Sequence, residues 1–109
     1  MSRMYVIVNK DMGKRIRKRG MTKCYQHVQG THAALQYAIA HRLSLKEWGN
    51  ETLIVLGATL KQFNHYFKKV MNIKAVTFFQ EPDLENQVTA FATILGEKDF
   101  GIFKRLELL

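Results

Sequence analysis

The strongest constraint on the fold is the alternation of short apolar runs with segments of helical periodicity. Residues 4–8, 52–56, 73–79 and 88–94 are rich in β-branched or aromatic side chains and are bounded by turn-forming residues. Apolar residues recur at helical spacing over 22–43 and 60–71, and a short final helix is expected over 99–106. The order β, α, β, α, β, β, α predicts helices packed on a sheet that is at least partly parallel.

The chain is expected to form a single α/β domain over residues 1–109. Its length suits one hydrophobic core, and its 47% hydrophobic and 24% charged residues are globular values. We expect a mixed, largely parallel four-stranded sheet with helices packed on both faces. The link 81–87 is too short for a helical crossover, so the last two strands are predicted to be antiparallel neighbours or to splay apart at an edge.

The first predicted helix, 22–43, carries large apolar residues on one stripe. Val28, Leu35, Ile39 and Leu43 follow one another at spacings of seven, four and four residues, with alanines between them. This spacing predicts that the stripe is the buried face of an amphipathic helix. Thr22 or Thr31 is expected to cap part of the helix.

A basic loop lies between the first strand and this helix. Its seven cations face only Asp11, so the segment contributes most of the formal charge of +8; they are Lys10, Lys14, Arg15, Arg17, Lys18, Arg19 and Lys23. Such focal charge attracts a polyanion, and nucleic acid is the first partner to consider. A solvated turn, DNA or an acidic protein are the alternatives that the charge alone leaves open.

Cysteine content and hydropathy restrict the remaining classes. The single Cys24 rules out an internal disulfide and a cysteine-based metal site. No run approaches the roughly 20 apolar residues of a membrane span, and the first apolar run is too short for a signal peptide. We therefore expect a cytoplasmic protein without a membrane partner. Apolar residues near the C-terminus, Leu106, Leu108 and Leu109, permit a homodimer.

Several motifs together resemble the type 2 peptidyl-tRNA hydrolase family. They are Val6-Ile7-Val8, Lys10-Asp11-Met12-Gly13-Lys14, Gln29-Gly30-Thr31-His32-Ala33-Ala34 and the closing Phe103-Lys104-Arg105-Leu106. Gln80-Glu81-Pro82, followed by Thr89-Ala90, looks closest to the family's divergent peptidyl-tRNA-hydrolase-domain branch. The resemblance implies hydrolysis of the ester between a peptide and the 3′ ribose of tRNA. It implies tRNA as the partner and no metal or other cofactor.

The chain departs from the family at two site positions. Where the family has a lysine, four residues before the motif glutamine, this chain has Tyr25. Lys23 lies about 160° away on a helix and is a substitute only if the helix begins after Tyr25. The family's aspartate aligns with Glu81 or with Asp83, and Thr89 matches one of the family's loop threonines.

The resemblance implies a site that hydrolyses its ester by water attack, without a covalent intermediate. Tyr25, Gln29 and His32 lie on one helical stripe. Gln29 is expected to orient the ester or the water, and Tyr25 to donate a hydrogen bond. Glu81 or Asp83 would orient or activate the water, with support from Thr89. His32 is interpreted as a catalytic base or as a core histidine hydrogen-bonded to the backbone.

Two other functions remain open at this point. A domain that keeps the fold and the basic loop but has lost the catalytic lysine is expected to be a non-catalytic tRNA- or RNA-binding module. A weaker third hypothesis is a protein that binds a partner protein through the same basic surface. Fold resemblance alone does not decide among them.

Overall fold

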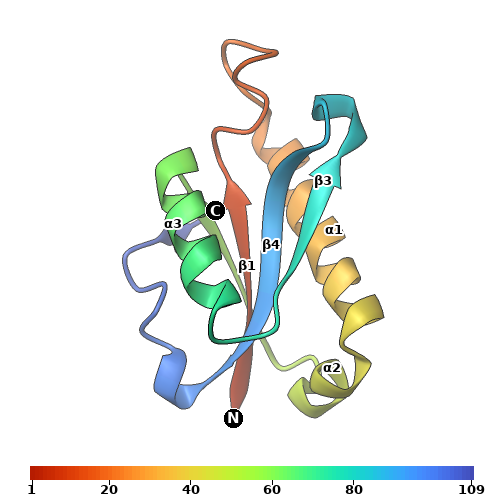
Figure 1. The fold of residues 1–109 in the computed structure, drawn as a ribbon, viewed down its shortest axis with the longest axis vertical. Coiled ribbons are helices and arrows are strands. Elements are labelled where there is room, and N and C mark those ends of the chain that lie inside the picture. The colour runs from red at the N-terminus through yellow and green to blue at the C-terminus, as the bar shows by residue number, and fades with distance from the viewer.

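A mixed five-stranded sheet lies between two layers of helices (Figure 1). The computed structural model describes all residues from 1 to 109. The strand order is β3-β4-β1-β2-β5. The strands are β1 Ser2–Asn9, β2 Thr52–Ala58, β3 Thr77–Glu81, β4 Gln87–Gly96 and β5 Glu107–Leu108. The helices are α1 Lys23–Ala40, α2 Arg42–Trp48 and α3 Leu60–Met71, with 3₁₀ turns at Pro82–Leu84 and Glu97–Asp99.

The single α/β domain with helices on both faces is confirmed, whereas the four-stranded, largely parallel sheet is wrong. Only β1 and β2 pair in parallel; β1–β4, β3–β4 and β2–β5 are antiparallel. The fifth strand has only two paired residues, which is too short to leave a periodic signal in the sequence. No helix combines the length and the apolar character that crossing a bilayer would need.

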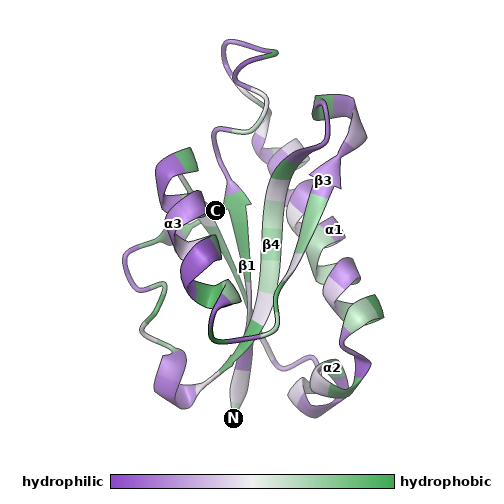
Figure 2. Cartoon of the chain, in the orientation of Figure 1, coloured by the Kyte–Doolittle hydropathy of each residue, from purple (hydrophilic) through white to green (hydrophobic).

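Successive side chains of strand β1 point to opposite faces of the sheet, and so the strand contributes to both hydrophobic cores. Tyr5 and Ile7 point into the core under α3, while Met4, Val6 and Val8 point into the core under α1. In Figure 2 the two central strands, β1 and β4, are mostly hydrophobic, and the loop beyond β1 is mostly hydrophilic. The core under α3 also contains Phe63, Val70, Phe91, Leu95 and Phe103.

The buried face of α1 was predicted wrongly. The exposed fraction is 46% for Val28, 55% for Leu35 and 70% for Ile39. Leu43, which lies beyond the end of α1, is exposed as well. The face packed on the sheet is instead made of Gln26, Gln29, Gly30, Ala33 and Tyr37. A Cβ atom on Gly30 would lie 3.2 Å from methyl groups of Val6 and Val8, so the small residues let the helix approach β1 closely.

The predicted final helix over 99–106 does not form. Its backbone makes successive four-residue turns, in which Ile102, Lys104 and Leu106 donate to the carbonyls of Asp99, Gly101 and Phe103. Leu106 is buried rather than available for a homodimer, whereas Leu108 is exposed. The third strand is also shifted: it spans Thr77–Glu81 instead of 73–79, so Glu81 belongs to the strand.

Three strands end at the same edge of the sheet. Strand β3 and strand β1 both run antiparallel to β4, and β2 is parallel to β1, so Asn9, Ala58 and Glu81 lie at one edge. The basic loop leaves this edge after β1, and α3 begins there after β2 (Figure 1). Functional groups commonly gather beyond the carboxyl ends of parallel strands, and β1 and β2 provide such ends here.

We expect Gly30→Ala to destabilise the protein although alanine is the better helix former. The propensity gain of about 1 kcal/mol is outweighed by overlap with Val6 and Val8, which costs about 1–3 kcal/mol. Urea unfolding would measure the difference. The matched control is Gly96→Ala, because no atom lies within 4 Å of the added Cβ and φ is −84°. Equal stability of the two variants would contradict the tight approach of α1.

Candidate functional site

Four of the six candidate catalytic side chains form one hydrogen-bonded network. Both the Tyr25 hydroxyl and the Gln29 amide Nε2 donate to Glu81 Oε1, each at 2.9 Å. The Thr89 hydroxyl donates to Gln29 Oε1 at 2.7 Å. Residues separated by 52 to 60 positions in the chain thus converge from α1, β3 and β4.

A β-bulge turns Thr89 toward this network. The register of β3 and β4 shifts between Phe79 and Gln80, so that Phe79 pairs with Ala90 and Gln80 with Val88. Thr89 is the unpaired extra residue. Val88 packs on the α3 side and Ala90 on the α1 side, and the bulge places Thr89 on the α1 side as well. Bulges commonly re-aim one side chain in this way next to functional sites.

The network fixes the orientation of the Gln29 amide. A carboxylate only accepts hydrogen bonds, so the Gln29 NH₂ group must face Glu81 and its carbonyl must face Thr89. Gln29 and Thr89 are both 0% exposed, whereas Tyr25 and Glu81 are only partly buried. A ligand would therefore contact Tyr25 and Glu81 first. Gln29 lies deeper and donates its hydrogen bond to Glu81 from the protein interior.

The surroundings of Glu81 favour its ionised form. Burial raises the pKa of the carboxyl, but hydrogen bonds from Gln29, Tyr25 and the Asp83 backbone, together with the charge of His32, outweigh burial and lower the pKa below 4.5. Glu81 is therefore a carboxylate at neutral pH. Its second oxygen, Oε2, accepts no side-chain hydrogen bond.

Tyr25 is held in its protonated form. Burial and the hydrogen bond to Glu81, together with the negative charges of Glu81 and Asp83, raise the pKa of Tyr25 to about 12. The tyrosine thus donates a hydrogen bond where the family's lysine would do so, but it supplies no positive charge. Helix α1 begins at Lys23, with the Thr22 hydroxyl accepting from the Tyr25 amide, so Lys23 does not take the lysine's place.

The other two candidates lie beside the network. His32 is half-buried and stacks on Phe79, with ring centroids 4.3 Å apart and planes within 10° of parallel. It makes no hydrogen bond to the backbone, so the predicted buried core histidine is wrong. Asp83 is exposed in the 3₁₀ turn Pro82–Leu84 and makes no side-chain hydrogen bond. Of the two candidate carboxylates, Glu81 is the one in the network.

All seven cations of the basic loop are exposed. Only Lys14 has an acidic partner, with its Nζ 2.6 Å from Asp11 Oδ1. The other six are free to bind anions. The loop is folded on itself through hydrogen bonds from the amides of Ile16 and Arg17 to the Gly13 carbonyl and from the Gly20 amide to the Arg17 carbonyl.

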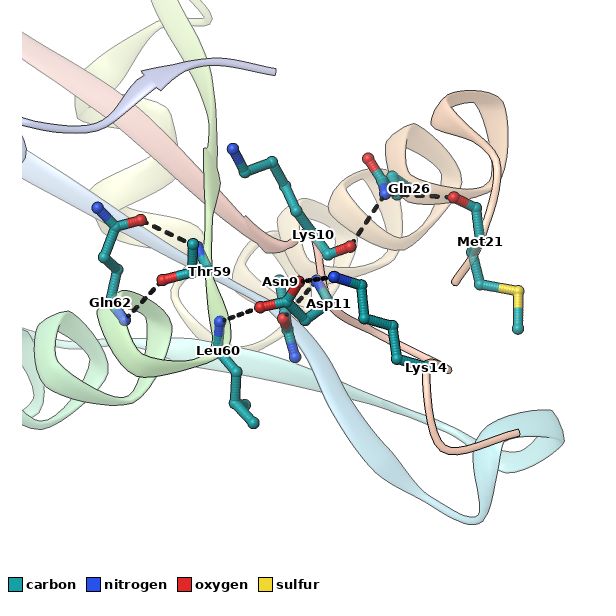
Figure 3. Close-up of polar contacts among 9 residues, drawn as sticks. All are labelled: Asn9, Lys10, Asp11, Lys14, Met21, Gln26, Thr59, Leu60 and Gln62. Carbon is teal, nitrogen blue, oxygen red and sulfur yellow. Dashed lines mark hydrogen bonds and ion pairs between the residues drawn. The ribbon is translucent and has the colours of Figure 1, made fainter. Parts of the chain in front are cut away.

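Both ends of the basic loop are attached to helix α1 (Figure 3). The Gln26 amide donates to the carbonyls of Lys10 at 3.4 Å and Met21 at 3.3 Å, which ties the two ends to α1. The Gly13 amide donates to Gln87 Oε1 at 3.1 Å, and Gln87 is the strand partner of Glu81. The backbone at both ends of the loop is therefore attached close to the strand end that carries Glu81.

Two residues that attach the loop, Gln26 and Gln87, were not predicted from the sequence. Gln26 is buried on α1 one turn before Gly30, and a buried glutamine requires partners, which was the available signal. Gln87 left no comparable signal. No cluster of three or more His, Cys, Asp or Glu side chains is arranged to bind a metal ion.

Comparison with protein-family models and with curated proteins finds no match for this chain. The site is therefore interpreted from its own geometry.

Thr89→Val is expected to destabilise the protein by about 1–3 kcal/mol, because the isosteric change leaves the buried Gln29 carbonyl without its donor. Chemical denaturation would measure the loss. Thr31→Val is the control, since Thr31 is an exposed α1 residue whose hydroxyl bonds only the His27 carbonyl. A loss no larger than that of the control would show that the Thr89 bond contributes no stability.

The stability contribution of Glu81 is expected to depend on pH. Because the folded-state pKa is lowered, the contribution is fully present above the unfolded pKa of about 4.5 and is lost as pH falls through the folded value. The stability difference between wild type and Glu81→Gln should therefore shrink as pH falls below 4.5. Unfolding curves between pH 7 and pH 3 would measure it. Glu85→Gln, at an exposed position, is the control.

Proposed function

We propose that this protein hydrolyses the ester bond of peptidyl-tRNA, releasing peptide and tRNA. What supports the proposal is one observation. A partly exposed, ionised Glu81, held by Tyr25 and Gln29, lies beside an anchored loop with six unpaired cations. The loop supplies an RNA-binding surface and the network supplies hydrolytic groups, and the two meet at one edge of the sheet.

In the proposed reaction, a water molecule attacks the acyl carbon. Glu81 Oε2 accepts a hydrogen bond from the water and directs its oxygen toward the ester carbonyl. The bond between the acyl carbon and the ribose 3′ oxygen breaks, the water's oxygen stays with the peptide, and a proton passes to the 3′ oxygen. A carboxylate with a lowered pKa is a weak base, so Glu81 acts mainly by orienting the water.

Tyr25 would hold Glu81 in place, because its single hydroxyl proton is donated to Glu81 Oε1 and leaves Oε2 for the water. Its raised pKa keeps the hydroxyl protonated across the physiological range. Gln29 is fully buried, so we assign it a positioning role rather than contact with the ester. Thr89 fixes the Gln29 amide in turn.

The basic loop would bind tRNA phosphates. Contacts to phosphates provide affinity and salt dependence without reading sequence. RNA recognition by shape and by a single-stranded end suits a substrate whose reactive bond is at the tRNA 3′ terminus.

A non-catalytic RNA-binding module is the second candidate, and one observation favours it. Tyr25 and Gln29 both direct hydrogen-bond donors at the same oxygen of Glu81. In this candidate the network stabilises the contact of α1 with β3 and performs no chemistry, while the basic loop binds RNA.

The decisive experiment measures peptide release from an N-blocked aminoacyl-tRNA. We expect release by the wild type, with Glu81→Gln lowering kcat at least about 100-fold through loss of the water-orienting carboxylate. Tyr25→Phe should also slow release, because it removes one donor from the network. Glu85→Gln should release peptide at the wild-type rate.

Binding of deacylated tRNA is measured in parallel. Absence of release by the wild type would refute the hydrolase, and salt-sensitive tRNA binding without release would establish the second candidate. If a folded Glu81→Gln variant releases peptide at the wild-type rate, Glu81 has no role in the reaction.

A further inference from the structure

A second cationic surface lies on the opposite face of the sheet from the Glu81 network. The loop accounts for most of the net charge, and the other ten cations and eight carboxylates nearly cancel in number. These cations and carboxylates are not evenly distributed over the molecule. Helix α3 has no acidic residue, and five of the ten cations lie on α3 or directly after Phe103: Lys61, Lys68, Lys69, Lys104 and Arg105.

This surface is concave. Two adjoining hollows, of about 280 and 310 Å³, share His65, Tyr66 and Arg105 as lining residues. Lys69 and Lys104 line the first, and Lys61 lines the second. Neither is lined by a carboxylate. We call the group Lys61, His65, Lys69, Lys104 and Arg105 the α3 basic surface.

The cations of the α3 basic surface are free and their backbone is held firmly. None of Lys61, Lys69, Lys104 and Arg105 forms an ion pair, since the two pairs in the structure are Lys14–Asp11 and Lys74–Asp99. Phe103, 2% exposed, packs edge-on against Tyr66 of α3 with centroids 5.6 Å apart. This aromatic contact fixes the segment bearing Lys104 and Arg105 against the helix.

The spacing of the cations suits an extended anion. Lys61, His65 and Lys69 follow one another every four residues and form one stripe on α3. Eight residues of helix separate Lys61 from Lys69, a rise of about 12 Å. The two lysines are therefore spaced to act as separate contacts along an extended sugar–phosphate backbone. Concave surfaces of one charge sign also concentrate the electrostatic potential.

The basic loop and the α3 basic surface are mechanically joined. Asp11 Oδ2 accepts from the amide of Leu60 at 2.8 Å, so the base of the loop touches the first turn of α3 (Figure 3). Lys61 follows Leu60 directly. The cations therefore continue from the loop, over the edge where the strands end, and onto α3.

We propose that the α3 basic surface binds the phosphate backbone of the stem of the same tRNA whose 3′ end reaches Glu81. This inference rests on the proposed function for the placement of the RNA end. The basic loop then lies between the single-stranded end and the stem, and the protein contacts the RNA on both sides of the sheet edge.

The test compares two double variants in binding to deacylated tRNA and to a single-stranded RNA hexamer ending in CCA. Lys69→Ala with Arg105→Ala removes two cations from the α3 basic surface. Arg42→Ala with Lys46→Ala removes two exposed cations from α2, at the other end of the molecule from the loop (Figure 1). The two proteins have equal net charge. Circular dichroism confirms that both are folded.

We expect the α3 variant to bind tRNA about tenfold more weakly and its log–log salt slope to fall by about 2, close to 0.9 for each lost phosphate contact. Its affinity for the hexamer should stay unchanged, because the hexamer has no stem. The α2 variant should bind both RNAs like the wild type.

The inference would be overturned by an absence of tRNA binding by the wild type, by equal weakening of tRNA binding in both double variants, or by equal weakening of tRNA and hexamer binding. Peptide release separates this inference from the proposed function. If the α3 variant binds tRNA as tightly as the wild type and still releases peptide, the role of the α3 basic surface would be refuted while the proposed hydrolysis would stand. Weakened tRNA binding without release in any variant would refute the hydrolase alone.

Discussion

The close approach of α1 to β1 at Gly30 determines where the candidate site forms. With only a hydrogen as the Gly30 side chain, the helix lies against Val6 and Val8, and the neighbouring Gln29 is completely buried. At that depth an amide must find partners within the protein. Thr89 and Glu81 provide them, the first because a bulge turns it to this side of the sheet. Helix packing thus determines the position of the carboxylate.

The positions of helices and strands were predicted from the sequence better than the faces that they bury. The bounds of α3 were close because its apolar spacing is regular and Thr59 and Gln62 form a capping box. The buried face of α1 was predicted wrongly because the largest apolar residues were expected to face the sheet. The helix instead packs closely through the small residues Gly30 and Ala33. Tyr25, Gln29, Glu81 and Thr89 could be nominated from motifs. Their meeting depends on the bulge, which has no sequence signature, and on long-range contacts that no local pattern encodes.

Tyr25 stabilises Glu81 by hydrogen bonding without adding a positive charge to the site. Tyr25 gives Glu81 a neutral donor at 2.9 Å, and the positive charge that acts on Glu81 from α1 is that of His32. A developing oxyanion beside an unneutralised carboxylate is destabilised. The nearest abundant positive charge is in the basic loop, and exposed charges act weakly beyond a Debye length of about 8 Å at physiological salt. In the proposed reaction, the effect of the loop cations therefore depends on how close a bound substrate brings them to Glu81.

Asp11 gives the molecule a further property. Its carboxylate binds Lys14 within the loop and caps the first turn of α3, so one short side chain joins two separate elements. Surfaces on those elements keep a fixed spacing without help from a ligand. A polymer that binds one of them holds its next segment near the other at high effective concentration. Affinity for long ligands can then rise steeply with their length, while short fragments bind weakly to either surface alone.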